Sequence, residues 1–408
     1  MNTTGEMMTK INGWVLIIGG KSELVYKAHR LGLQVVRLID RSPTDVKEID
    51  LAEHVVTADF NDEKMVINIA CALNQVFHFK QAISLSEDML VISAKVREAL
   101  CLPGVSVEVA MLLKDKALMR AHLAKSNFPS ILWKFCTNSD HVIEFIKENR
   151  LSKVILKPVC GAGSEGVRVI CKGDSVPTVV ADILSKGWKE FLVEEFLEGE
   201  EISVEAFSFN GKHQILATTK KTITAGCIER GHVLPYQPDG LDDIEAFVME
   251  FLNTVGLKDG PSHTELKLTS TGPQIIESHN RVGGDHINEL LNQVYKVDPK
   301  EVAISYACGM QETSPFYNPQ GYAAIRYAIV PAGKLSSNPK VAISERKSVQ
   351  LLDSRLVFEV GQIIPPLSDS SARAGFVIAA GDNYEYLDQT MSHWLESVEK
   401  AVAEAMES

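Results

Sequence analysis

The dipeptide Asn210-Gly211 narrows the possible folds more than any other feature, because it separates two apolar runs. Ile202–Phe209 precedes it and His213–Thr219 follows it. An Asn-Gly connection between such runs is typical of a tight β-hairpin. A second hairpin is predicted by Thr264–Leu268 and Gln274–His279, which flank a short stretch of turn residues. The middle of the chain is therefore expected to form an antiparallel sheet.

The first hundred residues follow a different pattern, in which apolar strands alternate with helical segments. Trp14–Ile18 is a buried-strand run, and the turn Gly19-Gly20 leads into a helical pattern over Glu23–Leu31. Further strands are expected at 34–39, 54–57 and 82–85. Such alternation predicts a parallel, Rossmann-like layer. The glycine pair lacks the G-x-G-x-x-G pattern of a dinucleotide site, so a tight strand-to-helix turn explains it better.

The rest of the chain adds one long helical pattern and more short strands. The pattern from Ser106 to Lys125 predicts a helix. From about Lys153 the strands become antiparallel, with three expected before the first hairpin at 154–159, 167–171 and 191–196. The last hundred residues add strands at 323–329, 354–360 and 374–380 and a helix from about Tyr386. The chain is therefore expected to be a mixed α/β (α+β) protein.

Composition and charge argue against some classes of partner. The 408 residues are 45% hydrophobic and 23% charged, which is ordinary for a globular chain with two or three packed units. A net charge of −12 argues against a nucleic-acid or anionic-membrane binder, because no overall positive field would attract such a partner. No apolar stretch approaches the roughly 20 residues that span a bilayer, and Met1 to Asn12 lacks the apolar core of a signal peptide. Seven scattered cysteines without a C-x-x-C pair favour a reducing cytoplasm over a disulfide framework or a zinc ribbon.

A lysine and three glycines lie between two predicted strands at residues 156–167. Lys157 ends the first strand, and Gly161, Gly163 and Gly166 follow, with Ser164 among them. Glycines let backbone N–H groups turn toward an anion, and the lysine adds a positive charge. The segment is no Walker loop, because it lacks G-K-[ST] and a strand follows it. It could hold phosphates, or it could be a glycine-rich hairpin beside an ordinary lysine.

Two carboxylates, Glu265 and Glu277, lie on the second predicted hairpin. A turn centred on Thr271 would place them directly opposite each other, roughly 5 Å apart. Such a pair is tolerated when one group is protonated or a cation lies between them, and Mg²⁺ held by carboxylates and substrate phosphates is a common arrangement. Ile275 and Ile276 interrupt the alternation of the strand, so a different register with two exposed glutamates stays open.

The segment after Glu277 combines an arginine with glycines at the start of a helical pattern. Arg281 precedes Gly283-Gly284, and the pattern over His286–Tyr295 predicts a helix. Backbone N–H groups at a helix N-terminus and a nearby guanidinium are suited to hold an anion. Asp285 could cap this helix whether or not an anion binds there.

Five acidic residues cluster around a strand end. Such a run would repel phosphates, so it suits the hydroxyl and amino groups of a nucleoside, or it is a solvated acidic turn. The five are Glu194, Glu195, Glu198, Glu200 and Glu201.

In chain order these features resemble the ATP-grasp superfamily, from about Lys116 to Gly284. The resemblance implies that Lys116 and Lys157 grip ATP under a mobile lid loop. That loop would comprise Gly161, Gly163, Ser164 and Gly166. The adenine would be read by Glu194, Glu195 and Leu197, and the ribose hydroxyls would bind Glu201.

The same resemblance assigns the phosphate end of the site. Lys220, which has Lys221 beside it, corresponds to a further phosphate-side cation. Glu265 and Glu277 correspond to the metal ligands. Arg281, with the amides of Gly283 and Gly284, corresponds to the group that stabilises an acyl phosphate. The superfamily pattern usually reads Glu-x-Asn-x-Arg, whereas here His279 stands at the asparagine position, so the coordination of a second metal ion is open.

Within the superfamily the chain resembles bacterial L-amino-acid ligases, which make dipeptides. Three segments carry this resemblance, at 229–235, 276–284 and 369–375. They imply that Glu229 lies in a loop that holds an amino-acid substrate, with His232 and His279 nearby. A structural role for His232 is an equal alternative.

The resemblance also implies an architecture in three units. Residues 1–110 would form a Rossmann-like unit, 111–310 an ATP-grasp domain with a lid at about 120–195, and 311–408 a β-rich C-terminal subdomain. The enzyme would use ATP and Mg²⁺, with Mn²⁺ as an alternative metal, on small-molecule amino acids. It would lie in the cytoplasm as a homodimer, without nucleic-acid or membrane partners.

Three other functions stay open on the sequence. A related ligase could join formate or another small acid to a purine-pathway amine, and a carboxylase could use bicarbonate and biotin. A protein that only binds nucleotides is a third alternative. It would not need both carboxylates, both lysines and Arg281 together.

Overall fold

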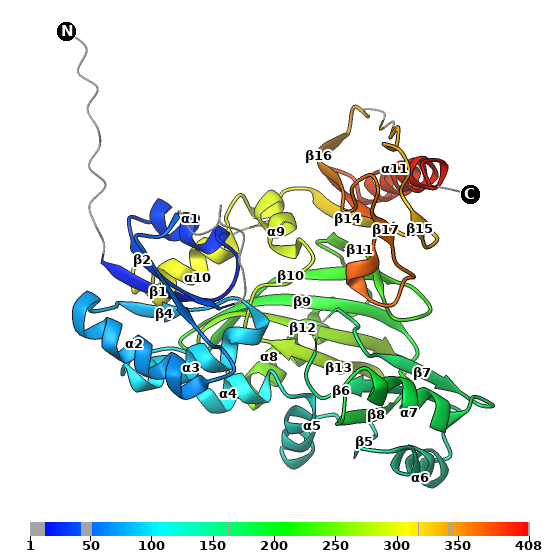
Figure 1. Ribbon diagram of the computed structural model, residues 1–408, viewed down its shortest axis with the longest axis horizontal. Helices are drawn as coiled ribbons and strands as arrows, with labels where there is room; N and C mark the ends of the chain where they lie inside the picture. The colour runs from blue at the N-terminus through cyan, green and yellow to red at the C-terminus, as the bar shows by residue number, and fades with distance from the viewer. Residues whose placement is uncertain are drawn as a thin grey trace.

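The computed structural model describes residues 13–41, 51–161, 163–316, 318–341, 343 and 346–406. The N-terminal segment 1–12, predicted to lack a signal-peptide core, lies outside the described residues. Three main sheets organise the chain: an N-terminal layer in blue, a lid sheet in teal and green, and a large sheet that runs from green to orange (Figure 1). No helix among the described residues combines the length and the apolar character needed to cross a membrane.

The N-terminal layer is a parallel sheet, as the alternation of strands and helices predicted. Its strand order is β3-β2-β1-β4. The strands are β1 (Trp14–Ile18), β2 (Gln34–Asp40), β3 (His54–Ala58) and β4 (Gln81–Ile83), and the helices are α1 (Glu23–Arg30), α2 (Glu63–Phe77) and α3 (Leu90–Ala99). The central strands are buried on both faces, which explains their continuous apolar sequence.

The predicted helix from Ser106 to Lys125 is in fact two helices, α4 (Val107–Leu112) and α5 (Lys116–Lys125). Asp115 lies between them with an extended backbone, and its side chain accepts a hydrogen bond from the N–H of Leu118. This N-cap starts a new helix, because it satisfies a backbone donor that would otherwise lack a partner. Lys116 therefore lies in the first turn of α5.

The lid sheet has the antiparallel order β5-β8-β6-β7. Its strands are β5 (Trp133–Cys136), β6 (Lys153–Pro158), β7 (Arg168–Cys171) and β8 (Phe191–Glu195). Helices α6 (Ser139–Asn149) and α7 (Val176–Ser185) pack on it through one apolar cluster. The loop between β6 and β7 contains the glycines predicted to form the lid loop.

The large sheet has eight strands in the order β13-β12-β9-β10-β11-β14-β18-β16. The strands from the middle of the chain are β9 (Glu200–Phe209), β10 (Lys212–Ile223), β11 (Glu229–Leu234), β12 (Gly260–Thr269) and β13 (Gly272–His279). On β9, Ile202, Val204 and Ala206 join an apolar cluster with α5 and α8 (Leu241–Thr254). By alternation, Glu201, Ser203 and Glu205 lie on the opposite face, where the polar site forms.

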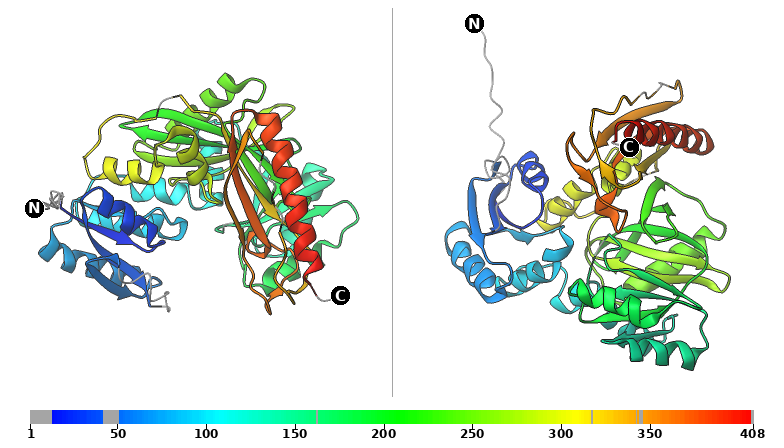
Figure 2. Two further views of the ribbon diagram at one scale, coloured as in Figure 1. Left: turned by 90° about the horizontal axis from the view of Figure 1, so that it is seen from above. Right: turned by 45° about the vertical axis from the view of Figure 1, so that its right-hand side comes forward.

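The C-terminal strands continue this same sheet. They are β14 (Tyr322–Ala328), β16 (Val349–Leu356) and β18 (Gly375–Gly381), and α11 (Tyr384–Glu404) packs along them (Figure 2). The strand predicted at 354–360 thus lies about five residues earlier, because the exposed stretch after Leu356 does not pair. Shorter elements are α9 (Ile287–Tyr295), α10 (Pro299–Ala307), β15 (Gly333–Lys334), β17 (Ile363–Ile364) and the 3₁₀ turns η2 (Glu87–Met89) and η3 (Ser370–Ala372).

Among the register shifts of the large sheet, two β-bulges set which residues face the site. Between β9 and β10, Ile215 pairs with Ala206 but Ala217 pairs with Glu205, so Leu216 is an extra residue. Between β12 and β13, Leu266 pairs with Ile275 but Glu265 pairs with Glu277, so Ile276 is an extra residue. Each bulge moves the residues beyond it to the other face of its strand.

Candidate functional site

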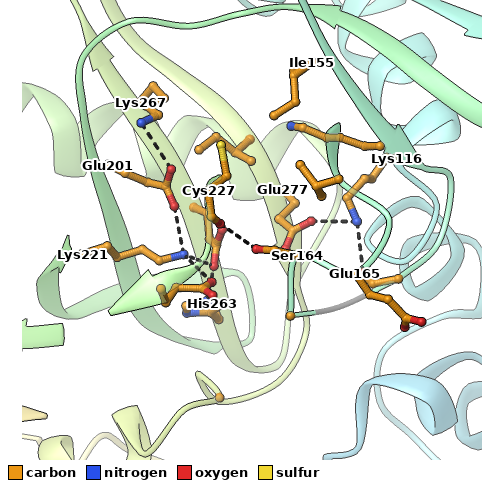
Figure 3. Close-up of a pocket in the computed structure, with 18 of the residues that line it drawn as sticks. Lys116, Ile155, Ser164, Glu165, Glu201, Lys221, Cys227, His263, Lys267 and Glu277 are labelled. Atoms are coloured by element: carbon orange, nitrogen blue, oxygen red, sulfur yellow. Dashed lines mark hydrogen bonds and ion pairs between the residues drawn. The ribbon is translucent and has the colours of Figure 1, made fainter. Parts of the chain in front are cut away.

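A cavity of about 370 Å³ lies between the lid sheet and the polar face of the large sheet (Figure 3). Most of the predicted site residues line it: Lys116, Lys157, Gly161, Gly163, Ser164, Glu194, Glu195, Leu197, Glu201, Glu229, His232, Glu265, Glu277, Arg281 and Gly284. Four predicted residues do not: Gly166, Lys220, His279 and Gly283.

Lys157 is held at the lid side of the cavity by a buried carboxylate. Its Nζ lies 2.8 Å from Oε2 of Glu194, whose Oε1 lies 2.8 Å from Nε of Arg120. Burial would raise the pKa of Glu194, but these two cations outweigh it and lower the pKa to about 2. Arg120 also donates to the carbonyls of Ile275 and Ile276, so it ties the lid sheet to β13. The side chain of Glu194 is thus committed to cations.

The lid loop contacts three other parts of the chain. Its Gly161 carbonyl accepts a hydrogen bond from Lys116, and its Ser164 hydroxyl donates to the carbonyl of Cys227 at 2.7 Å. The backbone N–H of Ser370 in η3 donates to the carbonyl of Gly163. Gly166 has φ +73°, and a Cβ there would lie 2.7 Å from the Pro158 ring. Gly166 does not line the cavity, and it packs tightly against Pro158. We therefore infer that Gly166 determines the shape of the loop.

Glu265 and Glu277 face each other across β12 and β13, as predicted. The predicted turn centre was wrong, because Thr269 pairs with Gly272 at the tip of the hairpin. The bulge at Ile276 compensates for this difference and brings the carboxylates opposite. Glu265 lies 2.5 Å from Nζ of Lys221, and Glu277 lies 2.7 Å from Nζ of Lys116.

Both carboxylates are held in the ionised form. Burial would raise the pKa of Glu265, but Lys221 and His263 outweigh it and keep the pKa below its usual range. Burial would also raise the pKa of Glu277, but Lys116 outweighs burial and lowers this pKa. His263 lies between Glu205 and Glu265; burial lowers its pKa, but these two glutamates outweigh burial and raise the pKa to about 9.

Lys221, rather than the predicted Lys220, is the cation that points into the cavity. Its Nζ lies within 3.3 Å of carboxylate oxygens of Glu201, Glu229 and Glu265. Lys220 points to the other face, where it lies 3.0 Å from Glu200. The bulge at Leu216 causes this exchange, since it shifts the facing of every later residue on β10.

The remaining carboxylates of the acidic run serve different partners. Glu201 lies 3.2 Å from Lys221 and 3.3 Å from Lys267, at the edge of the cavity. Oε1 of Glu195 accepts a hydrogen bond from the N–H of Leu132. Leu197 adds an apolar wall near these residues.

The predicted anion loop lies beside the carboxylate pair. Nη2 of Arg281 lies 2.5 Å from Oε2 of Glu87 in the N-terminal unit. Asp285 does not cap α9: its backbone is left-handed, and its carboxylate accepts two hydrogen bonds from Arg373. His286 precedes the helix without a capping hydrogen bond. The first turn of α9 is therefore not capped by either side chain.

A second cavity of about 640 Å³ adjoins the first. The two share Glu87, Arg281, Gly284 and Asp285 in their walls. Gly283 and charged residues of both signs line the second cavity, including Lys21, Glu23, Glu289, Lys300 and Arg373. Apolar groups are contributed by Leu24, Leu85, Val282, Tyr327, Val357 and Phe376.

His232 and His279 are buried without hydrogen-bond partners in the described structure. Each is 2% exposed, and neither ring nitrogen of either residue is bonded. His232 lines the first cavity, 3.7 Å from Asp285. His279 lies behind Glu277, with Nε2 3.6 Å from its Oε1. Thus His279 supports the carboxylate pair from outside the cavity wall.

Sequence reasoning missed several residues of the site. His263 could have been found, because it lies two residues before Glu265 and therefore on the same face of the strand. Glu87 comes from the separate N-terminal unit, and no local pattern marks it. Arg120 and Arg373 depend on partners far away in the sequence.

The carboxylate pair suits a hard divalent cation. Among the described residues no group of three or more His, Cys, Asp or Glu side chains could hold a metal alone. Glu265 and Glu277 nevertheless supply two ionised carboxylates beside three lysines. Mg²⁺ is commonly bound by one or two carboxylates together with substrate phosphates, and this donor set fits that pattern.

Residues 151–289 match the family model of the ATP-grasp domain, which covers the lid loop and the carboxylate pair. The chain contains an ATP-grasp domain. It is 25% identical over 410 residues to dapdiamide A synthase of Enterobacter agglomerans, covering 95% of this chain and 94% of that protein. It is 28% identical over 262 residues to human (Homo sapiens) carnosine synthase 1, a match that spans 56% of this chain but only 31% of that longer protein.

Solved structures show the same ATP-grasp fold. An L-amino acid ligase from Bacillus licheniformis superposes with a TM-score of 0.81 at 21% identity, covering 95% of this chain and 98% of that one. Phosphoribosylglycinamide synthetase from Anaerococcus prevotii gives 0.69 at 17% identity, over 94% and 98% of the two chains. The fold of this chain is thus the one that these ligases and synthetases share.

Proposed function

We propose that this ATP-grasp enzyme joins two amino acids, using ATP to activate the carboxylate of the first. The observation that carries the proposal is that the cavity containing the carboxylate pair adjoins a second cavity, which is lined by charges of both signs. An amino acid carries both an ammonium and a carboxylate, whereas formate offers only a carboxylate. The names of the relatives, dapdiamide A synthase and carnosine synthase 1, agree with amide products of this kind.

ATP would lie in the first cavity, with its phosphates among Lys116, Lys157 and Lys221. Glu265 and Glu277 would hold Mg²⁺, or Mn²⁺, and the bound metal would neutralise charge on the phosphate oxygens. Glycines of the lid loop would cover the phosphates and exclude water from the reaction. The base and ribose would lie toward Glu195, Leu197 and Glu201.

The reaction then proceeds in two steps. A carboxylate oxygen of the first amino acid attacks the γ-phosphorus, the bond to the β-phosphate oxygen breaks, and ADP leaves. Arg281 and the amides of Gly283 and Gly284 stabilise the resulting acyl phosphate. The neutral amine of the second amino acid attacks the acyl carbon, phosphate leaves, and the nitrogen loses a proton to give the amide.

Glu229 and His232 are the residues we assign to the amino-acid side of the first cavity. Glu229 is oriented by Lys221 at 3.3 Å and by the hydroxyl of Ser370 at 2.9 Å. The unpartnered ring nitrogens of His232 could form hydrogen bonds with a substrate. His279 would act behind the metal ligand instead of on the substrate.

Three features stay proposals alongside this function. We propose the unit boundaries 1–110, 111–310 and 311–408, with the lid at about 120–195. We also propose a homodimer, which sedimentation of the purified protein would test, and a cytoplasmic location, which cell fractionation would test.

The test supplies the protein with ATP, Mg²⁺ and the twenty amino acids, singly and in pairs. Released phosphate is measured together with the mass of every product. We expect a dipeptide and ADP in equal amounts for some pairs. Phosphate release without an amide across all pairs, or an amide only when formate or bicarbonate replaces the first amino acid, would refute the proposal.

A further inference from the structure

His263 bridges two carboxylates beneath the floor of the ATP cavity. Its Nδ1 lies 2.8 and 3.0 Å from the two carboxylate oxygens of Glu205, and its Nε2 lies 3.2 Å from Oε1 of Glu265. The strand register places His263 directly opposite Glu205 across β12 and β9. His263 is 4% exposed and Glu205 is 1% exposed. The bridge is therefore enclosed by protein.

The contacts on Glu265 are unequal between its two oxygens. Lys221 and His263 both contact Oε1. Within the described residues, no group donates a hydrogen bond to Oε2. This arrangement fixes the rotation of the carboxylate while it leaves one oxygen available to a cation.

Glu205 also contacts the loop that leads into α9. A Cβ on Gly283 would lie 3.0 Å from Oε2 of Glu205 and 2.8 Å from the side chain of Ile287. The Ser203 hydroxyl donates to Oε1 of Glu205 at 2.7 Å and fixes the carboxylate from the other side. The same buried pair therefore touches Glu265 at one end and the Gly283 loop at the other.

We propose that His263 and Glu205 are positioning residues that set the metal-facing orientation of Glu265 and align it with the Gly283 loop. Both act through a neighbour, since His263 contacts Glu265 and Glu205 contacts His263. The inference rests on the proposed function in one respect, namely that Glu265 is a metal ligand. Groups that orient metal ligands commonly change metal affinity by 10–100-fold when they are removed.

A buried histidine–glutamate pair could instead contribute only to the stability of the sheet. Thr264 offers a matched control for this alternative. It lies on the same strand with its side chain on the opposite face, where its hydroxyl bonds that of Ser278 at 2.8 Å. Thr264→Val removes a buried hydrogen bond from β12 without touching the His263 bridge.

The experiment measures Mn²⁺ binding by electron paramagnetic resonance in the presence of a non-hydrolysable ATP analogue. Wild type, His263→Gln, Glu205→Gln and Thr264→Val are compared, and thermal unfolding is followed in parallel. Glutamine at 263 carries its donors on a single nitrogen, whereas the imidazolium donates from two separate ring nitrogens, so glutamine does not reproduce the bridge. We expect His263→Gln to weaken Mn²⁺ binding by about tenfold or more, and Thr264→Val to change it by less than about twofold.

The inference is overturned if His263→Gln binds Mn²⁺ as wild type does while its melting temperature falls as in Thr264→Val. If His263→Gln does not fold, Glu205→Gln decides by the same comparison. Wild type that binds Mn²⁺ with the nucleotide but forms no amide would refute the proposed function alone. Wild type that binds no Mn²⁺ with the nucleotide would refute the metal assignment, and the positioning role with it.

Discussion

Glu265 and Glu277 face each other across β12 and β13, and each carboxylate contacts its own lysine. Lys221 lies 2.5 Å from Glu265, and Lys116 lies 2.7 Å from Glu277. The two negative charges therefore lie in the middle of the cavity floor, with one positive charge on each side. A metal–triphosphate complex complements this order, because its cation suits the two carboxylates and its phosphates suit the lysines. The predictions below test this arrangement.

Replacing a carboxylate of the pair should separate catalysis from nucleotide binding. Glu277→Gln keeps the shape of the side chain but removes a charged metal ligand, so turnover should fall by at least about 100-fold. ATP affinity should fall much less, because the lysines and the lid remain. Turnover assays and calorimetric measurement of ATP binding check these two expectations. Glu198→Gln is the control, since Glu198 is exposed and, within the part of the chain that the structure describes, its side chain pairs with Lys153 alone. Equal losses in both variants would argue against the metal assignment.

The two adjacent lysines should behave very differently. Lys221→Met leaves three partly buried glutamates without their shared cation, which should cost about 3–5 kcal/mol of unfolding free energy as well as activity. Lys220→Met removes a part-exposed ion pair with Glu200 and a cation–π contact with Tyr236, and should cost at most about 2 kcal/mol. Urea denaturation of both variants measures the difference. Equal losses of unfolding free energy in the two variants would contradict the opposite side-chain directions that the bulge at Leu216 gives Lys220 and Lys221.

Glu194 should make stability depend on acid pH. Its pKa is lowered to about 2 from the ordinary value of 4.5, so its contribution is fully present above pH 4.5 and is lost as the pH falls toward 2. Glu194→Gln should lack this part of the acid sensitivity. Unfolding free energies measured between pH 6 and pH 3 for both proteins give the comparison. Parallel curves would show that Arg120 and Lys157 do not hold this carboxylate.

Gly166 should tolerate alanine poorly for two separate reasons. Its backbone is left-handed, which costs a residue with a Cβ about 1–2 kcal/mol. A Cβ there would also overlap the Pro158 ring. Gly173→Ala is the matched control, because Gly173 also has positive φ but open space around it. Gly166→Ala should therefore lower the melting temperature more than Gly173→Ala does, and the reverse order would contradict the packing of the lid loop.

Much of the fold could be predicted from local pattern. The parallel layer follows from alternating strands and helices, and the hairpin at Asn210-Gly211 follows from its turn residues. The helix break at Asp115 was missed, although an aspartate before Lys116 is a common N-cap. Local rules succeed here because neighbouring residues alone determine these elements.

The site was harder to predict because β-bulges depend on tertiary packing. A regular hairpin would place Lys220 on the same face as Glu201, and the bulge at Leu216 replaces it with Lys221. The bulge at Ile276 had the opposite effect, since it brought Glu265 and Glu277 together despite a wrong turn centre. Arg120 and Glu194 are 74 residues apart in sequence, and only the packed structure brings them into contact.

The measurement that tests the central claim most directly follows oxygen from the carboxylate to phosphate. The activated amino acid is labelled with ¹⁸O in its carboxylate, and the released phosphate is analysed by ³¹P NMR. Activation as an acyl phosphate predicts one ¹⁸O atom in the phosphate for each amide formed. Amide formation with unlabelled phosphate would contradict the account, and so would the appearance of the ¹⁸O label in AMP.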